Sequence, residues 1–149
     1  MPRKTTTLKM GVKLVNDCAT LPTKGSEGAA CYDLYLPDDV YIPPHTTKAV
    51  GVGLVFDIPQ GYRVDVFLRS SVAAKTMVRL ANAVGKIDCD YTGEIKLLLE
   101  NNGGVPVRFY RGERIAQFEI NKVTDVDLEK VTEVKETERA EGGIGSTGK

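Results

Sequence analysis

Tyr62-Arg63-Val64-Asp65-Val66-Phe67-Leu68 is the stretch that decides the fold class of this chain. Its core-type side chains recur at every second position, at Tyr62, Val64, Val66 and Leu68. A period of two is typical of a half-buried β-strand. The same period runs from Leu8 to Leu14 and from Val50 to Phe56. Each of these three stretches therefore predicts a strand with one face in a core.

Further short strands are expected along the rest of the chain, with proline or glycine turns between nearly every pair. They span Leu34–Leu36, Val40–Ile42, Ile95–Leu99, Val105–Phe109 and Arg114–Ile120. Many short strands at regular spacing predict an all-β antiparallel sandwich or jelly roll. One short helix is expected from Ser70 to Met77, capped by Ser70 or Ser71.

Size and charge limit the possible functions. With 149 residues, 20 basic and 20 acidic side chains and 42% apolar content, the chain predicts one globular domain. Net neutrality argues against polymeric DNA or RNA as a partner. No apolar run approaches the roughly 20 residues of a membrane span, and the stretch from Met1 to Thr5 does not resemble a signal peptide. We expect a cytoplasmic protein without a membrane partner, or one in the host cytoplasm if it is viral.

Cysteine and histidine usage narrows the chemistry further. Cys18, Cys31 and Cys89 are odd in number and widely spaced, so we expect reduced thiols that act as small apolar fillers. His45 is the single histidine and follows two prolines. A zinc deaminase needs several His or Cys ligands, and a Ser-His or Cys-His pair would have to use His45. The general base of an enzyme would then be a carboxylate.

The end of the packed domain is expected near Val134. Val126, Leu128, Val131 and Val134 are possible core contacts, whereas the chain from residue 135 is charged and then rich in glycine. We therefore divide the chain into a β domain at 1–134 and a flexible C-terminal arm at 135–149. The arm resembles a phosphate-binding loop in its glycine spacing, but it lacks the following Ser/Thr and helix. Its glycine amides and hydroxyls remain suited to phosphates.

The segment from Gly85 to Glu94 carries three carboxylates and a tyrosine between glycines. Apolar residues flank it on both sides, so we expect it at the tip of a hairpin. Polar groups held at such a tip favour chemistry or ligand binding over packing.

Three other groups of residues allow two interpretations each. Arg69-Ser70-Ser71 follows a strand and suits a phosphate, or is a helix cap with a surface arginine. Gln117 lies on the opposite strand face from Ala116 and Phe118, where it either binds a ligand or meets water. Asp33 is either a turn residue or a carboxylate beside a metal.

Five segments together, in this order and spacing, resemble the five motifs of the homotrimeric dUTPase family. They are Ala29–Leu34, Arg69–Ser71, Asn82–Glu94, Arg111–Phe118 and Arg139–Gly148. The third segment and the glycine-rich fifth are the most specific. The resemblance implies a jelly-roll-like β domain in a threefold trimer, with active sites at subunit interfaces. A mobile C-terminal arm from another subunit would close each site.

The implied reaction is hydrolysis of dUTP to dUMP and pyrophosphate. Water would attack the α-phosphate in line, with Mg2+ bound to the triphosphate. Such enzymes keep uracil out of DNA and supply dUMP for thymidylate synthesis.

The resemblance also implies a role for each matching residue around the base and sugar. Asp88 corresponds to the general base that deprotonates water, and Tyr91 to the ring that packs under deoxyribose. The uracil pocket corresponds to Asn82 and to the backbone of Gly85, Lys86, Ile87 and Asp88. Lys96 aligns with a substrate contact of some members. Asp90, Thr92 and Glu94 are expected to shape the turn and its subunit contacts.

The remaining matches concern the phosphates. Arg69, Ser70, Ser71 and Gln117 would hold the α- and β-phosphates, with Gln117 grouped with Asp88 as catalytic. Asp33 would contact Mg2+ through water.

In the arm, Arg139, Ser146 and Thr147 would close over the β- and γ-phosphates. Ile144 replaces the phenylalanine that usually stacks on uracil, which predicts weaker closure. Leu68 and Met77 also depart from the family pattern, at positions where proline and glycine are usual.

Three alternatives stay open on the sequence. A dCTP deaminase-like enzyme shares this fold and an Arg-Ser-Ser segment, but the pairing of Asp88 with Tyr91 argues against it. A nucleotide-gated module that binds a protein partner is a possible added role. A capsid-like jelly roll explains the strands but neither the turn nor the arm.

Overall fold

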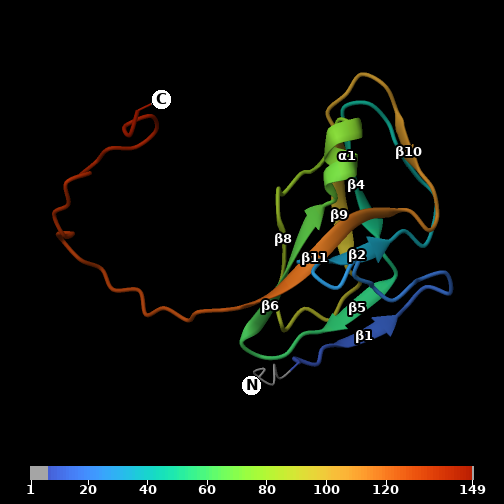
Figure 1. Ribbon diagram of the computed structural model, residues 1–149, viewed down its shortest axis with the longest axis horizontal. Helices are drawn as coiled ribbons and strands as arrows, with labels where there is room; N and C mark the ends of the chain where they lie inside the picture. Colours follow the sequence, from blue (N-terminus) through green and yellow to red (C-terminus); the bar gives the residue numbers. More distant parts are fainter. Residues whose placement is uncertain (1–6, 149) are drawn as a thin grey trace.

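The computed structural model describes residues 7–148, and within them the chain forms eleven strands and one short helix (Figure 1). The predicted domain start at residue 1 and the end of the predicted arm at Lys149 lie outside these residues. In chain order the elements are β1 (Gly11–Leu14), β2 (Tyr32–Tyr35), β3 (Val40–Ile42), β4 (Thr46–Gly51), β5 (Leu54–Asp57), β6 (Tyr62–Leu68), α1 (Ser70–Lys75), β7 (Val78–Leu80), β8 (Gly85–Ile87), β9 (Lys96–Asn101), β10 (Val107–Phe109) and β11 (Arg114–Lys122).

The predicted strands are confirmed where the alternation is cleanest. β3 and β6 have the expected bounds, and β9, β10 and β11 overlap the expected ranges within a few residues. The single strand expected from Val50 to Phe56 is wrong, because the chain bends between β4 and β5. Gly53 lies in the bend with a φ of 72°, and a side chain there would collide with Ala19 and Asn16.

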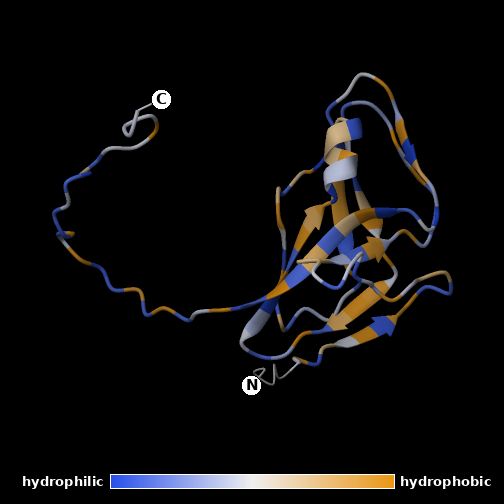
Figure 2. Cartoon of the chain, viewed as in Figure 1, coloured by the Kyte–Doolittle hydropathy of each residue, from blue (hydrophilic) through white to orange (hydrophobic). Residues whose placement is uncertain are grey.

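All strand pairs are antiparallel, and they form two main sheets. One has the order β2-β11-β6-β8 and the other β4-β9-β7, with β1-β5 and β10-β3 as separate pairs. Buried side chains of both sheets meet in one core, which includes Val66 and Phe118 from the first sheet and Leu97 from the second. The Phe118 ring lies 4.9 Å from that of Phe56 between their centroids. The body's strands carry most of the hydrophobic colour in Figure 2, and the all-β prediction is confirmed.

The helix α1 is shorter than expected and is not capped by a serine. It starts after Arg69, which occupies the N-cap position without a side-chain hydrogen bond. It ends at Lys75, and the backbone N–H and the hydroxyl of the C-cap residue Thr76 both donate to the carbonyl oxygen of Val72. Thr76 has an extended backbone, and β7 begins two residues later at Val78, so the helix does not continue to Met77. No helix among residues 7–148 is long and apolar enough to cross a membrane.

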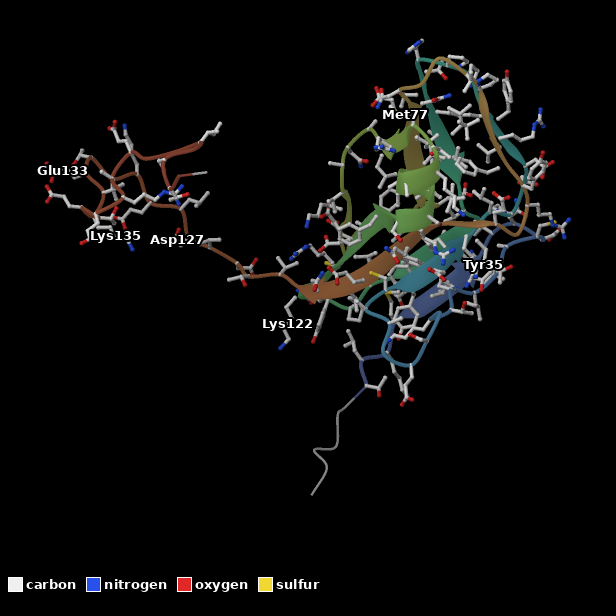
Figure 3. The ribbon with its side chains drawn as sticks, turned by 45° about the horizontal axis from the view of Figure 1, so that its top comes forward. Tyr35, Met77, Lys122, Asp127, Glu133 and Lys135 are labelled. Carbon is white, nitrogen blue, oxygen red and sulfur yellow. The ribbon has the colours of Figure 1, made fainter. Side chains whose placement is uncertain are left out.

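Beyond β11 the chain leaves the body as a long extension, residues 123–148 (Figures 1 and 3). Its apolar side chains are exposed, with exposed fractions of 75% for Val126, 90% for Leu128, 59% for Val131 and 84% for Val134. The expectation that they contact this chain's own core is therefore wrong. Asp127, Glu133 and Lys135 lie well away from the body in Figure 3. The domain boundary at residue 134 stays a prediction, since it depends on what covers these side chains.

Candidate active site

A buried carboxylate with two arginine partners organises one group of predicted site residues. Asp33 lies on β2 opposite Gln117 of β11 and is only 5% exposed. Its Oδ1 is 3.3 Å from Arg69 Nε, and its Oδ2 accepts a hydrogen bond of 3.1 Å from Arg114 Nη1. Arg69 also donates to the carbonyl oxygen of Arg114. Asp33 is thus a strand residue rather than a turn residue, and it holds the Arg69 guanidinium in place.

The same residues line an open depression on the outer face of the four-stranded sheet. Its walls are formed by Gly25, Ser26, Ala29, Ala30, Cys31, Asp33, Arg69, Ser70 and Gln117. Ser71 lines a neighbouring hollow together with Lys75 and Arg114. A guanidinium group, a hydroxyl and an amide converge on the depression, a combination that suits a phosphate. The structure thus brings the first, second and fourth predicted segments together. We call Asp33, Arg69, Ser70, Ser71 and Gln117 the phosphate-binding group.

The cysteines supply no nucleophile to this group. Burial raises the pKa of the Cys31 thiol, and the carboxylates of Glu119 and Asp33 raise it further. A raised pKa keeps the thiol protonated at neutral pH. All three cysteines are free, as expected, but Cys89 is exposed and so does not act as an apolar filler.

The predicted hairpin around residues 85–94 is wrong in its pairing. β7 pairs with β9, as a hairpin requires, but residues 81–95 between them leave that sheet. Within this excursion β8 pairs with β6 and becomes an edge strand of the four-stranded sheet. The segment therefore bridges the two sheets.

The turn after β8 is held by its own side chains. Tyr91 N–H donates to the carbonyl oxygen of Asp88, and Tyr91 Oη donates to that of Glu94 at 2.9 Å. Glu94 Oε1 accepts a hydrogen bond of 2.9 Å from the amide of Gly53, which anchors the turn to the bend between β4 and β5. The expectation that Glu94 shapes the turn is confirmed. Asp88 and Tyr91 remain exposed.

A second group of predicted site residues lies on and around the edge strand β8. We call it the base group, and it consists of Asn82, Gly85, Lys86, Ile87, Asp88 and Tyr91. β2 and β8 are the two edges of the four-stranded sheet. Three strand spacings separate them, or roughly 14 Å. None of the base group lines the depression that holds Asp33 and Arg69. Within one chain, the two groups do not form a single pocket.

The arm residues join neither group. Arg139 Nε donates to the carbonyl oxygen of Gly142 within the extension itself. Ile144, Ser146 and Thr147 are exposed. Lys96 is exposed at the start of β9. The structure thus leaves the fifth segment apart from the site it was predicted to close.

The described residues offer no metal cage of their own. No group of three or more His, Cys, Asp or Glu side chains among residues 7–148 is placed to hold a metal ion. Each Asp33 oxygen lies beside one arginine, and a carboxylate oxygen has a second acceptor position that water can use. A metal that arrives with its ligand and keeps its waters fits this donor set.

The sequence analysis missed one residue of the site, Arg114, and one buried charge outside the site, Asp65. Arg114 begins β11 and is 40% exposed at its side chain, so its sequence pattern is that of a solvated strand residue. Asp65 is buried in the middle of β6, where a charge between two valines is the only signal in the sequence.

Comparison with known proteins matches most of the chain to one family. The dUTPase family model matches residues 17–148. A deoxyuridine 5'-triphosphate nucleotidohydrolase from Nautilia profundicola is 41% identical over 142 residues, which cover 95% of this chain and 100% of that protein. A protein of the same name from Hydrogenobaculum sp. is 39% identical, with 95% and 99% covered.

A solved structure confirms the predicted jelly-roll-like architecture. The dUTPase of Staphylococcus bacteriophage 80alpha, in complex with dUPNHPP, matches with a TM-score of 0.87 at 26% identity. The match covers 95% of this chain and 99% of that one. That protein is described among phage dUTPases that control transfer of virulence genes.

Proposed function

The chain belongs to the dUTPase family and hydrolyses dUTP to dUMP and pyrophosphate, and we propose that Asp88 is the general base of this reaction. Asp88 follows β8 directly and is exposed, so its carboxylate is accessible to water. An aspartate is a weak base at neutral pH, so positioning and charge neutralisation supply most of the acceleration.

The residues of the phosphate-binding group bind the α- and β-phosphates. Asp33 holds Arg69 in a fixed orientation, so the guanidinium loses little freedom when it meets a phosphate. Ser70 and Ser71 donate from the start of α1. Gln117 donates its amide from β11 and, with Asp88, supports the step in which water attacks the α-phosphate. These donors stabilise negative charge as it shifts toward the leaving pyrophosphate.

The base group reads the nucleoside. Asn82 and the backbone from Gly85 to Asp88 offer the donors and acceptors that accept uracil and reject cytosine. Tyr91 packs against deoxyribose and leaves no space for a 2′-hydroxyl. Lys96 adds a further contact from β9.

The family generally uses a divalent metal, and we infer Mg2+ here. Mg2+ bound to the triphosphate neutralises its charge. Asp33 contacts such an ion through water, because its oxygens already face Arg69 and Arg114. Mg2+ usually keeps several waters, which suits an indirect contact.

We further propose a homotrimer whose active sites are shared between chains. The carrying observation is that no residue of the base group lines the depression that holds the phosphate-binding group, although dUTP must contact both groups. The exposed apolar side chains of residues 123–134 also require a cover, which a neighbouring chain supplies. The arm at 135–149 then brings Arg139, Ile144, Ser146 and Thr147 over a neighbouring site. We place the enzyme in the cytoplasm, where its free thiols stay reduced.

Mixed oligomers test the sharing directly. Arg69→Ala and Asp88→Asn are each expected to be inactive alone. Co-expressed with different tags and purified through both, they recover activity, because some sites combine the intact Arg69 of one chain with the intact Asp88 of another. Each mixed trimer purified in this way contains one complete site out of three, so about one third of the wild-type rate is restored.

A second mixture of two variants provides the control for this experiment. Arg69→Ala mixed with Gln117→Ala recovers nothing, because both residues come to each site from the same chain. No recovery in the first mixture would contradict shared sites.

A further inference from the structure

An ionic cluster around one buried carboxylate lies on the outer face of the four-stranded sheet, and of its members only Lys86 belongs to the site described so far. Its centre is Asp65 on β6, which is 3% exposed. The carboxylate receives Arg63 Nε at 3.1 Å, Lys86 Nζ at 2.8 Å and Asn121 Nδ2 at 2.8 Å. Asn121 also donates to Glu119. Three strands, β6, β8 and β11, therefore meet at one carboxylate.

Lys86 gives this cluster its link to the nucleotide. Its backbone belongs to the base group, while its side chain reaches back over β6 to Asp65. β8 is an edge strand with only three register pairs to β6, namely Val64↔Ile87, Asp65↔Lys86 and Val66↔Gly85. So short a strand depends on side-chain contacts for its exact position.

Removing the Lys86 side chain would leave the buried carboxylate of Asp65 with only Arg63 and Asn121 as partners. A buried charge that loses a partner is strongly destabilising, so the chain responds by moving β8 or admitting water. Either response displaces the backbone of Ile87 and Asp88. The cluster therefore acts on the geometry of the base group, and not only on global stability.

We propose that Asp65 is a positioning residue for nucleotide selection, which holds the base-reading strand β8 in register through Lys86. This inference rests on the proposed role of β8 in reading uracil. It assigns no contact between Asp65 and the nucleotide.

The test compares how well variants distinguish dUTP from dCTP. In Lys86→Met, the ratio of kcat/KM for dUTP to that for dCTP falls about tenfold, equivalent to about 1.4 kcal/mol. Lys86→Arg keeps the charge and keeps the ratio within about threefold of wild type. Asp65→Asn lowers the ratio by the same factor. Combining Asp65→Asn with Lys86→Met lowers it no further, because both changes remove the same interaction. Each is assayed well below its own unfolding temperature.

Lys13→Met is the matched control, because Lys13 is an exposed strand lysine in β1 outside the cluster. It leaves the ratio unchanged. A variant at Lys86 or Asp65 that unfolds at lower temperature but keeps the full ratio would overturn the inference, because the cluster would then be purely structural. If Lys86→Met does not fold, Asp65→Asn decides alone. A wild-type enzyme that does not prefer dUTP would instead contradict the proposed base-reading role.

Discussion

The ring of Tyr91 lies directly against Gly93. A Cβ added to Gly93 would be 2.6 Å from Tyr91 Oη and 2.7 Å from its Cζ. The hydroxyl reaches past Gly93 to the carbonyl oxygen of Glu94. Glycine is thus required for close approach, and it fixes the ring that we assign to the sugar.

Gly93→Ala is expected to displace Tyr91 and to weaken selection of deoxyribose. The added methyl cannot coexist with the ring in its present place, so kcat/KM for dUTP falls about tenfold and the preference over UTP narrows. Steady-state kinetics with both nucleotides measure this. Gly104→Ala is the control, because nothing lies within 4 Å of its added Cβ. If Gly93→Ala and the wild type had equal kinetics, the packing of Tyr91 against Gly93 would play no part in selecting the sugar.

The Asp65 cluster predicts a pH dependence of stability. Burial acts to raise the pKa of Asp65, but hydrogen bonds from Lys86, Asn121 and Arg63 outweigh it and lower the pKa below its ordinary value. A lowered native pKa contributes stability above the unfolded value of about 3.9. That contribution is lost as the pH falls through the lower native pKa.

Urea unfolding of wild type and Asp65→Asn across this pH range measures the effect. The difference in free energy of unfolding is expected to be about 1–3 kcal/mol near neutral pH and to shrink below pH ~4. A constant difference down to strongly acid pH would show that the ionised carboxylate is not the stabilising form.

A variant truncated before Arg139 tests the role of the arm separately from that of the rest of the chain. We expect the truncated protein to keep its oligomeric state, because the apolar extension up to Val134 remains. Its kcat/KM falls about 100-fold, since the phosphates lose the donors of the arm and the site stays open to water. Light scattering and pyrophosphate release check the two halves of the prediction. Full activity would show that the arm takes no part in the reaction.

Ile144→Phe is expected to strengthen closure of the arm. The side chain of Ile144 is fully exposed and cannot stack on a base as a ring does. A base–aromatic stack is worth about 1–3 kcal/mol, so KM for dUTP falls in this variant. Ile144→Leu provides the aliphatic control. An unchanged KM for Ile144→Phe would mean that this position does not meet uracil.

Much of the fold could be predicted because the strands alternate cleanly. β3 and β6 were predicted to the residue. The pairing of β8 could not be, since Gly85-Lys86-Ile87 has one apolar side chain and no alternation. Its place depends on β6, which is distant in sequence. The exposure of residues 123–134 was also unpredictable, because a sequence pattern does not say which chain covers an apolar side chain.

The sequence named candidate site residues, but it did not indicate which of them lie together in the structure. The five segments pointed to Asp33, Arg69 and Asp88 together. Only the sheet order shows that Asp33 and Asp88 belong to opposite edges. Arg114 was missed because its role depends on a partner at Asp33, across the pairing of β2 and β11.

The rate of pyrophosphate release from dUTP by Asp88→Asn tests the central claim most directly. The amide keeps the size of the carboxylate but cannot accept a proton from water, so the rate falls about 100- to 10,000-fold while dUTP still binds. Asp90→Asn, an exposed neighbour in the same turn, keeps the wild-type rate. Turnover of Asp88→Asn at the wild-type rate would contradict the assignment of Asp88 as the general base.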